Sequence, residues 1–470
     1  MQSITDLLQL INYLVLGYFI LLNLGYMILI GVSYFHIRKF KDLDKIFKMT
    51  GVYSTSLYKP VSVIAPAYNE EASIIASVDS LLSLKYSNFE VVVVNDGSSD
   101  GTLQKLLDHY KLTPENRHKP LFVKHKPIRG IYTSSRYPRL IVVDKENGGK
   151  ADALNAGINI ASMDLFCAVD SDSILEPDVI VKMLRTFMED DQTIAVGGVI
   201  RVANGCTYKN RRIEKVRVPK SFIGRIQAVE YLRAFLFGRV GWDYLESLLI
   251  ISGAFGLFER KAVIRAGGYL HDTVGEDMEL VVRLHDYHIK NKLPYRIRFI
   301  SEPVCWTEVP EDRKTLARQR NRWHRGLADT LFRYRHMLFN PRYGRIGLFA
   351  MPFFFFGELL SPVVEISGYI IVALSWWFGI INTQFAMLFL VAAIVLGMIL
   401  SMSAVLLEEL TSRRYESAKD IFILACYSFV ENLGYRQLHA FWRLGGLIDY
   451  FKGEKEWGKM QRKGIGEKSS

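Results

Sequence analysis

The sequence predicts an α/β domain with a mostly parallel sheet, inserted between membrane helices at its two ends. Short β-branched runs alternate with amphipathic stretches from residue 60 to about residue 335, as in strand–helix–strand units. Uncharged apolar segments flank this region, and the longest of them are long enough to cross a bilayer. Asp170 and Asp172 follow one buried-looking run, at the strand end where open α/β sheets bind ligands.

Composition sets broad limits on the function. The chain has 470 residues, half of them hydrophobic, and a formal net charge of +11. This excess of cations predicts anionic partners, either phosphates or a lipid surface, and we expect no nucleic-acid partner. The four scattered cysteines predict reduced, buried thiols rather than a disulfide framework.

The N-terminal segment, residues 1–35, predicts one transmembrane helix, because residues 11–31 are uncharged and almost entirely apolar. Five lysines and arginines follow in residues 36–48, which the positive-inside rule places in the cytoplasm. We expect residues 36–59 to form an amphipathic connector along the membrane surface.

A predicted domain at residues 60–335 begins with strands at 61–65 and 89–94, each followed by an amphipathic helix. Residues 114–139 read as a surface loop around one short strand near Phe122. A further strand, helix and strand follow at residues 141–143, 151–161 and 165–169.

Polar side chains at these strand ends suggest a phosphate site. Asp170 and Asp172 are hard oxygen ligands suited to Mg²⁺ or Mn²⁺, although a solvated turn is the simpler interpretation of such a pair. Two glycines before Lys150 would let backbone amides approach a phosphate, with the ammonium group as a point charge; an ordinary turn with a solvated lysine is the alternative.

Other polar positions also allow two interpretations each. Asp96 follows a strand, where it is either a plain turn residue or an acceptor for a uracil edge with Tyr68 stacked on the base. Asp277 lies where a helix begins, and a carboxylate there is more often a cap than a catalyst.

The basic helix predicted at residues 313–335 places Gln319, Arg322 and Trp323 on one face. This helix either lies on anionic lipid or closes a site, with Arg322 on a diphosphate and Trp323 stacked on a sugar.

Taken in order, six motifs resemble those of the membrane-bound family-2 glycosyltransferases, the group that includes cellulose, hyaluronan, chitin and poly-N-acetylglucosamine synthases. The resemblance covers about residues 60–335 and the membrane arrangement. The motifs are A-P-A-Y-N-E at 65–70, N-D-G-S at 95–98, N-G-G-K at 147–150, D-S-D at 170–172, G-E-D at 275–277 and Q-R-N-R-W at 319–323.

The resemblance implies an A-type glycosyltransferase (nucleotide-diphospho-sugar transferase) fold, a UDP-sugar donor, a divalent cation (Mg²⁺ or Mn²⁺) and an inverting mechanism. It assigns nucleotide binding to Ala67, Tyr68, Glu70, Asp96, Lys150 and Asp170, and the metal to Asp170 and Asp172. It makes Asp277, beside Glu276, the general base. Diphosphate and acceptor binding would fall to Gln319, Arg322, Trp323, Ser252 and Gly253.

The sequence departs from the family in two places. Gly275 stands where the synthases often have threonine, and residues 250–254 replace the F-F-C-G-S acceptor motif of cellulose synthases. The second departure argues against cellulose as the product.

The C-terminal membrane region is predicted at residues 336–440, with two spans at 366–381 and 385–407 joined through Asn382. Glu358 and Glu365 lie at or near membrane depth, where carboxylates are costly and are usually functional unless they lie at the interface or pair with a cation such as Arg436. The basic tail, residues 441–470, is predicted to be cytoplasmic.

These features together predict a multi-pass cell-membrane enzyme with a cytoplasmic catalytic domain. It would transfer a hexose or N-acetylhexosamine to a growing β-linked glycan and export the polymer, with or without accessory export proteins. One alternative is a single-addition enzyme with a lipid acceptor. Another is an inactive membrane scaffold that binds nucleotide.

Overall fold

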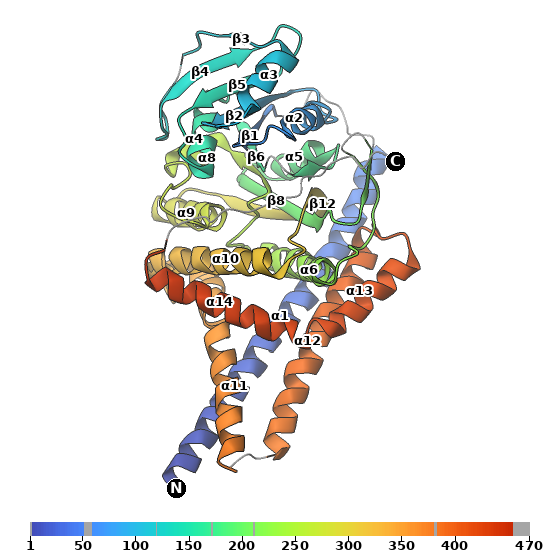
Figure 1. Cartoon of the computed structure of the whole chain (residues 1–470), viewed down its shortest axis with the longest axis vertical. Coiled ribbons are helices and arrows are strands. Elements are labelled where there is room, and N and C mark those ends of the chain that lie inside the picture. The colour runs from blue at the N-terminus through green and yellow to red at the C-terminus, as the bar shows by residue number, and fades with distance from the viewer. Residues whose placement is uncertain are drawn as a thin grey trace.

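The structure is a computed structural model that describes residues 2–50, 59–118, 120–170, 173–209, 212–379 and 383–454. A large sheet with its covering helices lies at one end of the molecule, and the long helices α1 (Gln2–Thr50), α11 (Ser361–Trp377) and α12 (Thr383–Thr411) extend from the other end (Figure 1). Helices α6 (Phe222–Leu232), α10 (Arg313–Arg333) and α14 (Tyr435–Phe451) lie across the middle, between the sheet and the long helices.

The sheet has ten strands in the order β3-β4-β5-β2-β1-β6-β11-β8-β12-β7. Parallel pairing joins β5, β2, β1 and β6, and also β8 with β12, so the predicted mostly parallel sheet is confirmed. Antiparallel β11 lies between β6 and β8. The strands are β1 (Val61–Ala67), β2 (Phe89–Asp96), β3 (Thr113–Pro114), β4 (Ile128–Thr133), β5 (Leu140–Lys145), β6 (Leu165–Val169), β7 (Ile174–Leu175), β8 (Thr193–Val202), β11 (Phe255–Glu259) and β12 (Arg296–Thr307), with β9 (Thr207–Lys209) and β10 (Arg212–Lys215) forming a separate hairpin.

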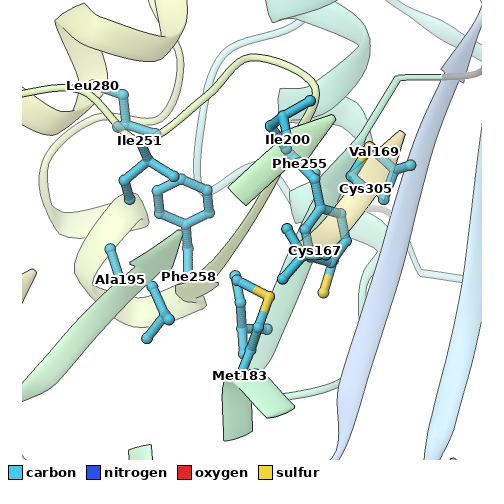
Figure 2. Packing of buried hydrophobic residues seen from close by; sticks show 14 of the residues in the cluster. Cys167, Val169, Met183, Ala195, Ile200, Ile251, Phe255, Phe258, Leu280 and Cys305 are labelled. Atoms are coloured by element: carbon cyan, nitrogen blue, oxygen red, sulfur yellow. The ribbon is translucent and has the colours of Figure 1, made fainter. Parts of the chain in front are cut away.

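The central strands are apolar on both faces because helices cover both faces of the sheet. The helices of this domain are α2 (Ile74–Leu82), α3 (Thr102–Tyr110), α4 (Lys150–Ile160), α5 (Val179–Glu189), α6 (Phe222–Leu232), α7 (Val240–Tyr244), α8 (Arg260–Arg265), α9 (Glu276–Lys290) and α10 (Arg313–Arg333). In the core, Cys167 of β6, Phe255 of β11 and Met183 of α5 pack together (Figure 2). Burial raises the pKa of the Cys167 thiol, so this cysteine stays protonated.

The prediction of a strand near Phe122 is wrong. Phe122 is 56% exposed, and Asn159 Oδ1 accepts hydrogen bonds from the backbone amides of Phe122 and Val123, both at 3.1 Å. Asn159 Nδ2 donates to the Val123 carbonyl at 2.7 Å, so one side chain supplies the partners that a neighbouring strand would supply. The strand of this region is instead β4, which pairs antiparallel with β5 and with the edge strand β3.

Among the described residues, two helical stretches are long and apolar enough to cross a membrane, Leu10–Arg38 and Ile394–Thr411. A third is present if the stretch Ile346–Leu359 and α11 (Ser361–Trp377), which meet at a 41° bend, form one span. Helix α1 runs without a break over Gln2–Thr50. The remaining helices are α12 (Thr383–Thr411), α13 (Ala418–Val430) and α14 (Tyr435–Phe451), whereas Asn382 lies outside the described residues.

Ion pairs join the sheet domain to the membrane helices. Arg201 of β8 and Glu408 of α12 form one pair in which both side chains are fully buried. Arg233, which follows α6, pairs with Glu431 beyond α13 at 2.5 Å. Because removing one partner of a buried pair leaves an uncompensated charge, these contacts fix how the domain sits on its membrane helices.

The carboxylates predicted at membrane depth have cationic partners. Glu365 lies 3.9 Å from Arg436, as the pairing alternative predicted. Glu358 instead pairs with Arg443 of α14 at 3.2 Å and accepts a hydrogen bond from Tyr26 of α1.

Candidate active site

The turn between β5 and α4 is held by Asp96, which lies at the carboxyl end of β2. Asp96 is 3% exposed, and its carboxylate accepts hydrogen bonds from the amides of Gly148 at 3.0 Å and Gly149 at 2.8 Å. The ammonium group of Lys145 lies 2.6 Å from the same carboxylate. Gly149 has φ +87°, a left-handed conformation that favours glycine. This network places Lys150 at the first position of α4.

Lys150 is the centre of a charged cluster drawn from four segments of the chain. Its Nζ atom lies 2.7 Å from Asp170 Oδ1 at the end of β6 and 3.1 Å from Glu276 Oε1 at the start of α9. It also donates to the Gly253 carbonyl at 2.9 Å, in the loop before β11. The structure therefore brings together Lys150, Asp170, Gly253 and Glu276, which the sequence analysis named separately.

Asp277 borders the same cluster. A Cβ atom placed on Gly253 would lie 3.1 Å from Asp277 Oδ2 and 3.6 Å from Lys150 Nζ, so both groups border the space that a side chain at residue 253 would fill. The other carboxylate oxygen of Asp277 accepts a hydrogen bond from the Met278 amide at 2.9 Å. Asp277 thus has one oxygen bonded to the start of its own helix and one facing the Gly253 segment.

Burial and mutual charge set the protonation of this cluster. Burial raises the pKa of Glu276, the Lys150 ammonium opposes that change, and the Asp277 carboxylate adds to it. For Lys150, burial acts to lower the pKa, but the Asp170 and Glu276 carboxylates outweigh it and the pKa is raised. Lys150 is therefore protonated at neutral pH and pairs with two carboxylates, those of Asp170 and Glu276.

The cluster's donor set is chemically suited to a divalent cation, because carboxylate oxygens are the ligands that Mg²⁺ and Mn²⁺ prefer. Across the described ranges, no group of three or more His, Cys, Asp or Glu side chains is spaced to hold a metal ion. Asp170 is the predicted metal ligand that the structure describes, and Asp172 lies outside the described residues.

A pocket of about 10 Å³ lies beside Asp170, between β1 and α2, and its mostly apolar lining includes Ala67, Ser77 and Ser173. The Ser173 hydroxyl is buried and makes no hydrogen bond with any residue that the structure describes. A buried hydroxyl without a hydrogen-bond partner is costly, so a water molecule or a ligand atom would complete its hydrogen bonding. Sequence reasoning missed Ser173, because serine after D-S-D looks like any turn residue.

The other predicted nucleotide residues lie near the end of β1. Ala67 is buried as the last residue of the strand, whereas Tyr68 is 52% exposed and free to present its ring. Glu70 accepts a hydrogen bond from the Ser73 hydroxyl at 2.6 Å and so supports the start of α2.

Helix α10 is placed on α9 by two glycines. A Cβ atom on Gly275 would lie 2.9 Å from the Cα atom of Gly326, so the two backbones touch. Gln319, Arg322 and Trp323 lie seven, four and three residues before Gly326, which puts all of them on the same face of α10 as this glycine. Gln319 is buried, and Arg320, one residue on, pairs with Glu230 of α6 at 2.8 Å with its guanidinium 4.6 Å from the Trp323 ring centre.

A second residue that sequence reasoning missed is Arg239, at the end of a π-helical segment, Arg233–Arg239, that links α6 to α7. Its Nε atom donates to the carbonyl of Ile251 at 2.6 Å, two residues before Gly253. Short π-helical segments often mark functional sites, but no residue pattern announces them in a sequence.

The sheet order, with the charged cluster at its strand ends, is that of the A-type glycosyltransferase fold. The chain matches Glycosyl transferase family 2 over residues 62–265 and Glycosyl transferase family group 2 over residues 165–405, which is more than half of its length. It therefore belongs to glycosyl transferase family group 2.

Individual relatives match the same region. The chain is 31% identical over 276 residues to a poly-β-1,6-N-acetyl-D-glucosamine synthase of Staphylococcus aureus, and 29% identical over 274 residues to the synthase of Staphylococcus epidermidis. Each match covers 58% of this chain and 56% of the relative, so the chain spans little more than half the length of these proteins.

Among solved structures, a mannosyltransferase from Pyrobaculum calidifontis, in complex with GDP-mannose and Mn²⁺, shares the fold. The TM-score is 0.51 at 18% sequence identity, over 90% of this chain and 99% of that one.

Proposed function

We propose that the protein is a membrane-embedded, inverting glycosyltransferase that transfers a hexose or N-acetylhexosamine from a UDP-sugar to a growing β-linked polysaccharide. The observation that carries this proposal is the convergence of Lys150, Asp170, Gly253, Glu276 and Asp277 on one point at the strand ends. The similarity to poly-β-1,6-N-acetyl-D-glucosamine synthases favours N-acetylglucosamine as the sugar.

In this mechanism Asp277 accepts the proton of the acceptor hydroxyl while the oxygen of that hydroxyl attacks the anomeric carbon. The bond from that carbon to the diphosphate breaks on the opposite face, and its electron pair leaves with the diphosphate. Lys150 and Arg322 offset the negative charge that develops there. Inversion of an α-linked donor gives a β-glycoside, and general-base assistance of this kind contributes about 10²–10⁴-fold to the rate.

Asp170 and Asp172 would hold a divalent cation, Mg²⁺ or Mn²⁺. When bound, the cation neutralises charge on the leaving diphosphate. The donor set supports this assignment, as does the Mn²⁺ in the complex of the archaeal mannosyltransferase of the same fold.

The metal assignment predicts that EDTA abolishes transfer by the purified protein and that added Mn²⁺ restores it. Asp172→Ala should remain inactive after Mn²⁺ is restored, because one ligand is missing. Asp178→Ala is the matched control, since this nearby carboxylate is half exposed and pairs with Lys182 at 2.9 Å on the surface. Full activity in EDTA would exclude metal-dependent transfer.

Two other functions make different predictions in one assay. Purified protein with Mn²⁺ and a panel of nucleotide sugars should release UDP and make long product from one sugar. A single-addition enzyme would give only a short, lipid-extractable glycoside, and a nucleotide-binding scaffold would release no UDP. No turnover with any sugar under these conditions would contradict the proposal.

The proposed arrangement in the cell follows the predicted boundaries. Residues 60–335 form the cytoplasmic catalytic domain, between an N-terminal helix and connector at residues 1–59 and a membrane region at 336–440 with a basic tail to residue 470. The cations after residue 36 support this orientation through the positive-inside rule. A lipid bilayer is the expected partner besides the UDP-sugar and the glycan, with or without accessory export proteins.

A further inference from the structure

The loop at residues 251–254 contacts most of the groups that the proposed transfer uses. Its Gly253 carbonyl accepts from Lys150 at 2.9 Å, and its Gly253 backbone lies against Asp277. The Ala254 carbonyl accepts from the Asp170 amide at 3.1 Å. A shift of this loop would therefore move the base, the lysine and the predicted metal ligand relative to one another.

Arg239 holds this loop from the side of the π-helical segment. Its Nε atom donates to the Ile251 carbonyl at 2.6 Å, and its Nη1 atom donates to the Ala234 carbonyl at 3.2 Å. The guanidinium plane lies 3.9 Å from the ring centre of Phe235, which is buried. Three contacts in different directions fix the guanidinium group, which a lysine could not reproduce.

The positive charge of Arg239 also interacts with the Asp277 carboxylate at the edge of the cluster. Burial lowers its pKa to about 10, and the carboxylate of Asp277 acts in the opposite direction. The group therefore stays charged at neutral pH, at a place where it interacts with Asp277.

We propose that Arg239 is a positioning residue of the transfer site: it fixes the loop at residues 251–254 so that Gly253 keeps Lys150 and Asp277 in register. The inference rests on the proposed function, because it concerns the same transfer step. The π-helical segment supports this role, because its wider turns set the direction in which Arg239, its last residue, leaves the helix.

The test compares Arg239→Ala and Arg239→Lys with Arg225→Ala in the full-length protein. Arg225 is the matched control: its Nε atom donates to the Pro219 carbonyl at 2.9 Å and its guanidinium lies 5.4 Å from the Tyr427 ring centre, but it contacts no residue of the cluster. Both Arg239 variants should lose kcat by about 10- to 100-fold with an unchanged KM for the donor, because orientation is lost and donor binding is kept. Arg225→Ala should keep the wild-type kcat.

Added guanidinium ion at millimolar concentration should restore part of the kcat of Arg239→Ala, a response that a folding defect would not give. Wild-type kcat in Arg239→Lys would overturn the proposal, because charge alone would then suffice. Loss in Arg239→Ala without rescue, accompanied by a lower Tm, would overturn it in favour of a purely structural role. A wild-type protein without transfer activity would instead refute the proposed function itself.

Discussion

Asp277 has two oxygens with different surroundings, and this separates its two interpretations. One oxygen accepts the amide of the next residue, Met278, in the first turn of α9, and the other lies beside Gly253, where Lys150 also lies. A carboxylate used only as a cap would not need a glycine backbone against its second oxygen. The contact with Gly253 is therefore what favours a chemical role.

Changing Asp277 to Asn should abolish transfer and preserve nucleotide binding. The amide can still accept the Met278 hydrogen bond but cannot take a proton, so kcat should fall by about 10²–10⁴-fold. Calorimetric titration with UDP should give a Kd close to that of the wild type. Turnover near the wild-type rate would remove Asp277 from the mechanism.

His285 is a buried group whose protonation opposes folding. Its ring lies between the Leu248 carbonyl, 2.8 Å from Nε2, and the Tyr295 hydroxyl, 2.9 Å from Nδ1, and burial lowers its pKa from 6.5 to about 4. The unfolded chain binds this proton below pH 6.5, whereas the folded protein does not until about pH 4. Stability should thus be lost as pH falls through this window.

The loss attributable to His285 is roughly 3 kcal/mol at the bottom of the window, from about 1.4 kcal/mol for each pH unit. His285→Gln should lose less Tm between pH 7 and pH 4.5 than the wild type does, because glutamine has no proton to gain. His109→Gln, at an exposed position, is the control. Equal acid sensitivity of the wild type and His285→Gln would contradict this account.

At the scale of elements, the contact between Gly275 and Gly326 explains why this chain departs from its family at residue 275. A threonine there would place its Cβ atom 2.9 Å from the Gly326 Cα atom, and a backbone atom cannot move aside as a flexible side chain does. The close packing of α9 on α10 therefore leaves no room for a side chain at residue 275.

Gly275→Ala should destabilise the protein by about 1–3 kcal/mol, the usual cost of overpacking, and should lower kcat because Asp277 moves with the start of α9. The matched control is Gly445→Ala on α14, where an added Cβ atom would meet only Asn321 Nδ2 at an ordinary 3.6 Å. Thermal unfolding and UDP release measure the two effects. An unchanged Tm in Gly275→Ala would mean that the helices separate without cost.

Sequence patterns predicted those elements and site residues whose signals are local. Lys150 and Asp170 each adjoin an apolar run, so a strand or helix end could be assigned to them without knowing the fold. Arg239 could not be found this way, because its role depends on a carbonyl twelve residues away and on a π-helical turn. The strand wrongly expected near Phe122 failed for a related reason: its hydrogen-bond partner is the side chain of Asn159, on a distant helix.

At the scale of the whole molecule, the question is whether the membrane helices only anchor the enzyme. The carboxylates of Glu365 and Glu358 pair with Arg436 and Arg443, as expected if these polar groups only hold the helices together. A small polar cleft nevertheless lies among these helices, lined by Glu365, Tyr369, Asn432, Arg436 and Gln437 together with Phe19 and Ile394. We propose that these side chains line part of a path for a hydrated sugar chain, because polar groups in apolar helices usually face a bundle interior or a water-filled cavity.

The export of the polymer that the sequence predicts implies that vesicles with the catalytic domain outward, supplied with UDP-sugar outside, accumulate long product in the lumen, protected from added glycanase. Tyr369→Ala should shorten this product with little change in initial UDP release, because the cleft would lose an aromatic ring that can carry a sugar while the transfer site is untouched. Trp377→Ala is the control, since that ring is 77% exposed on the outer surface of α11. Product that stays outside and is fully digested would show that the helices serve as an anchor alone, and the lipid-acceptor reaction would then be the better account.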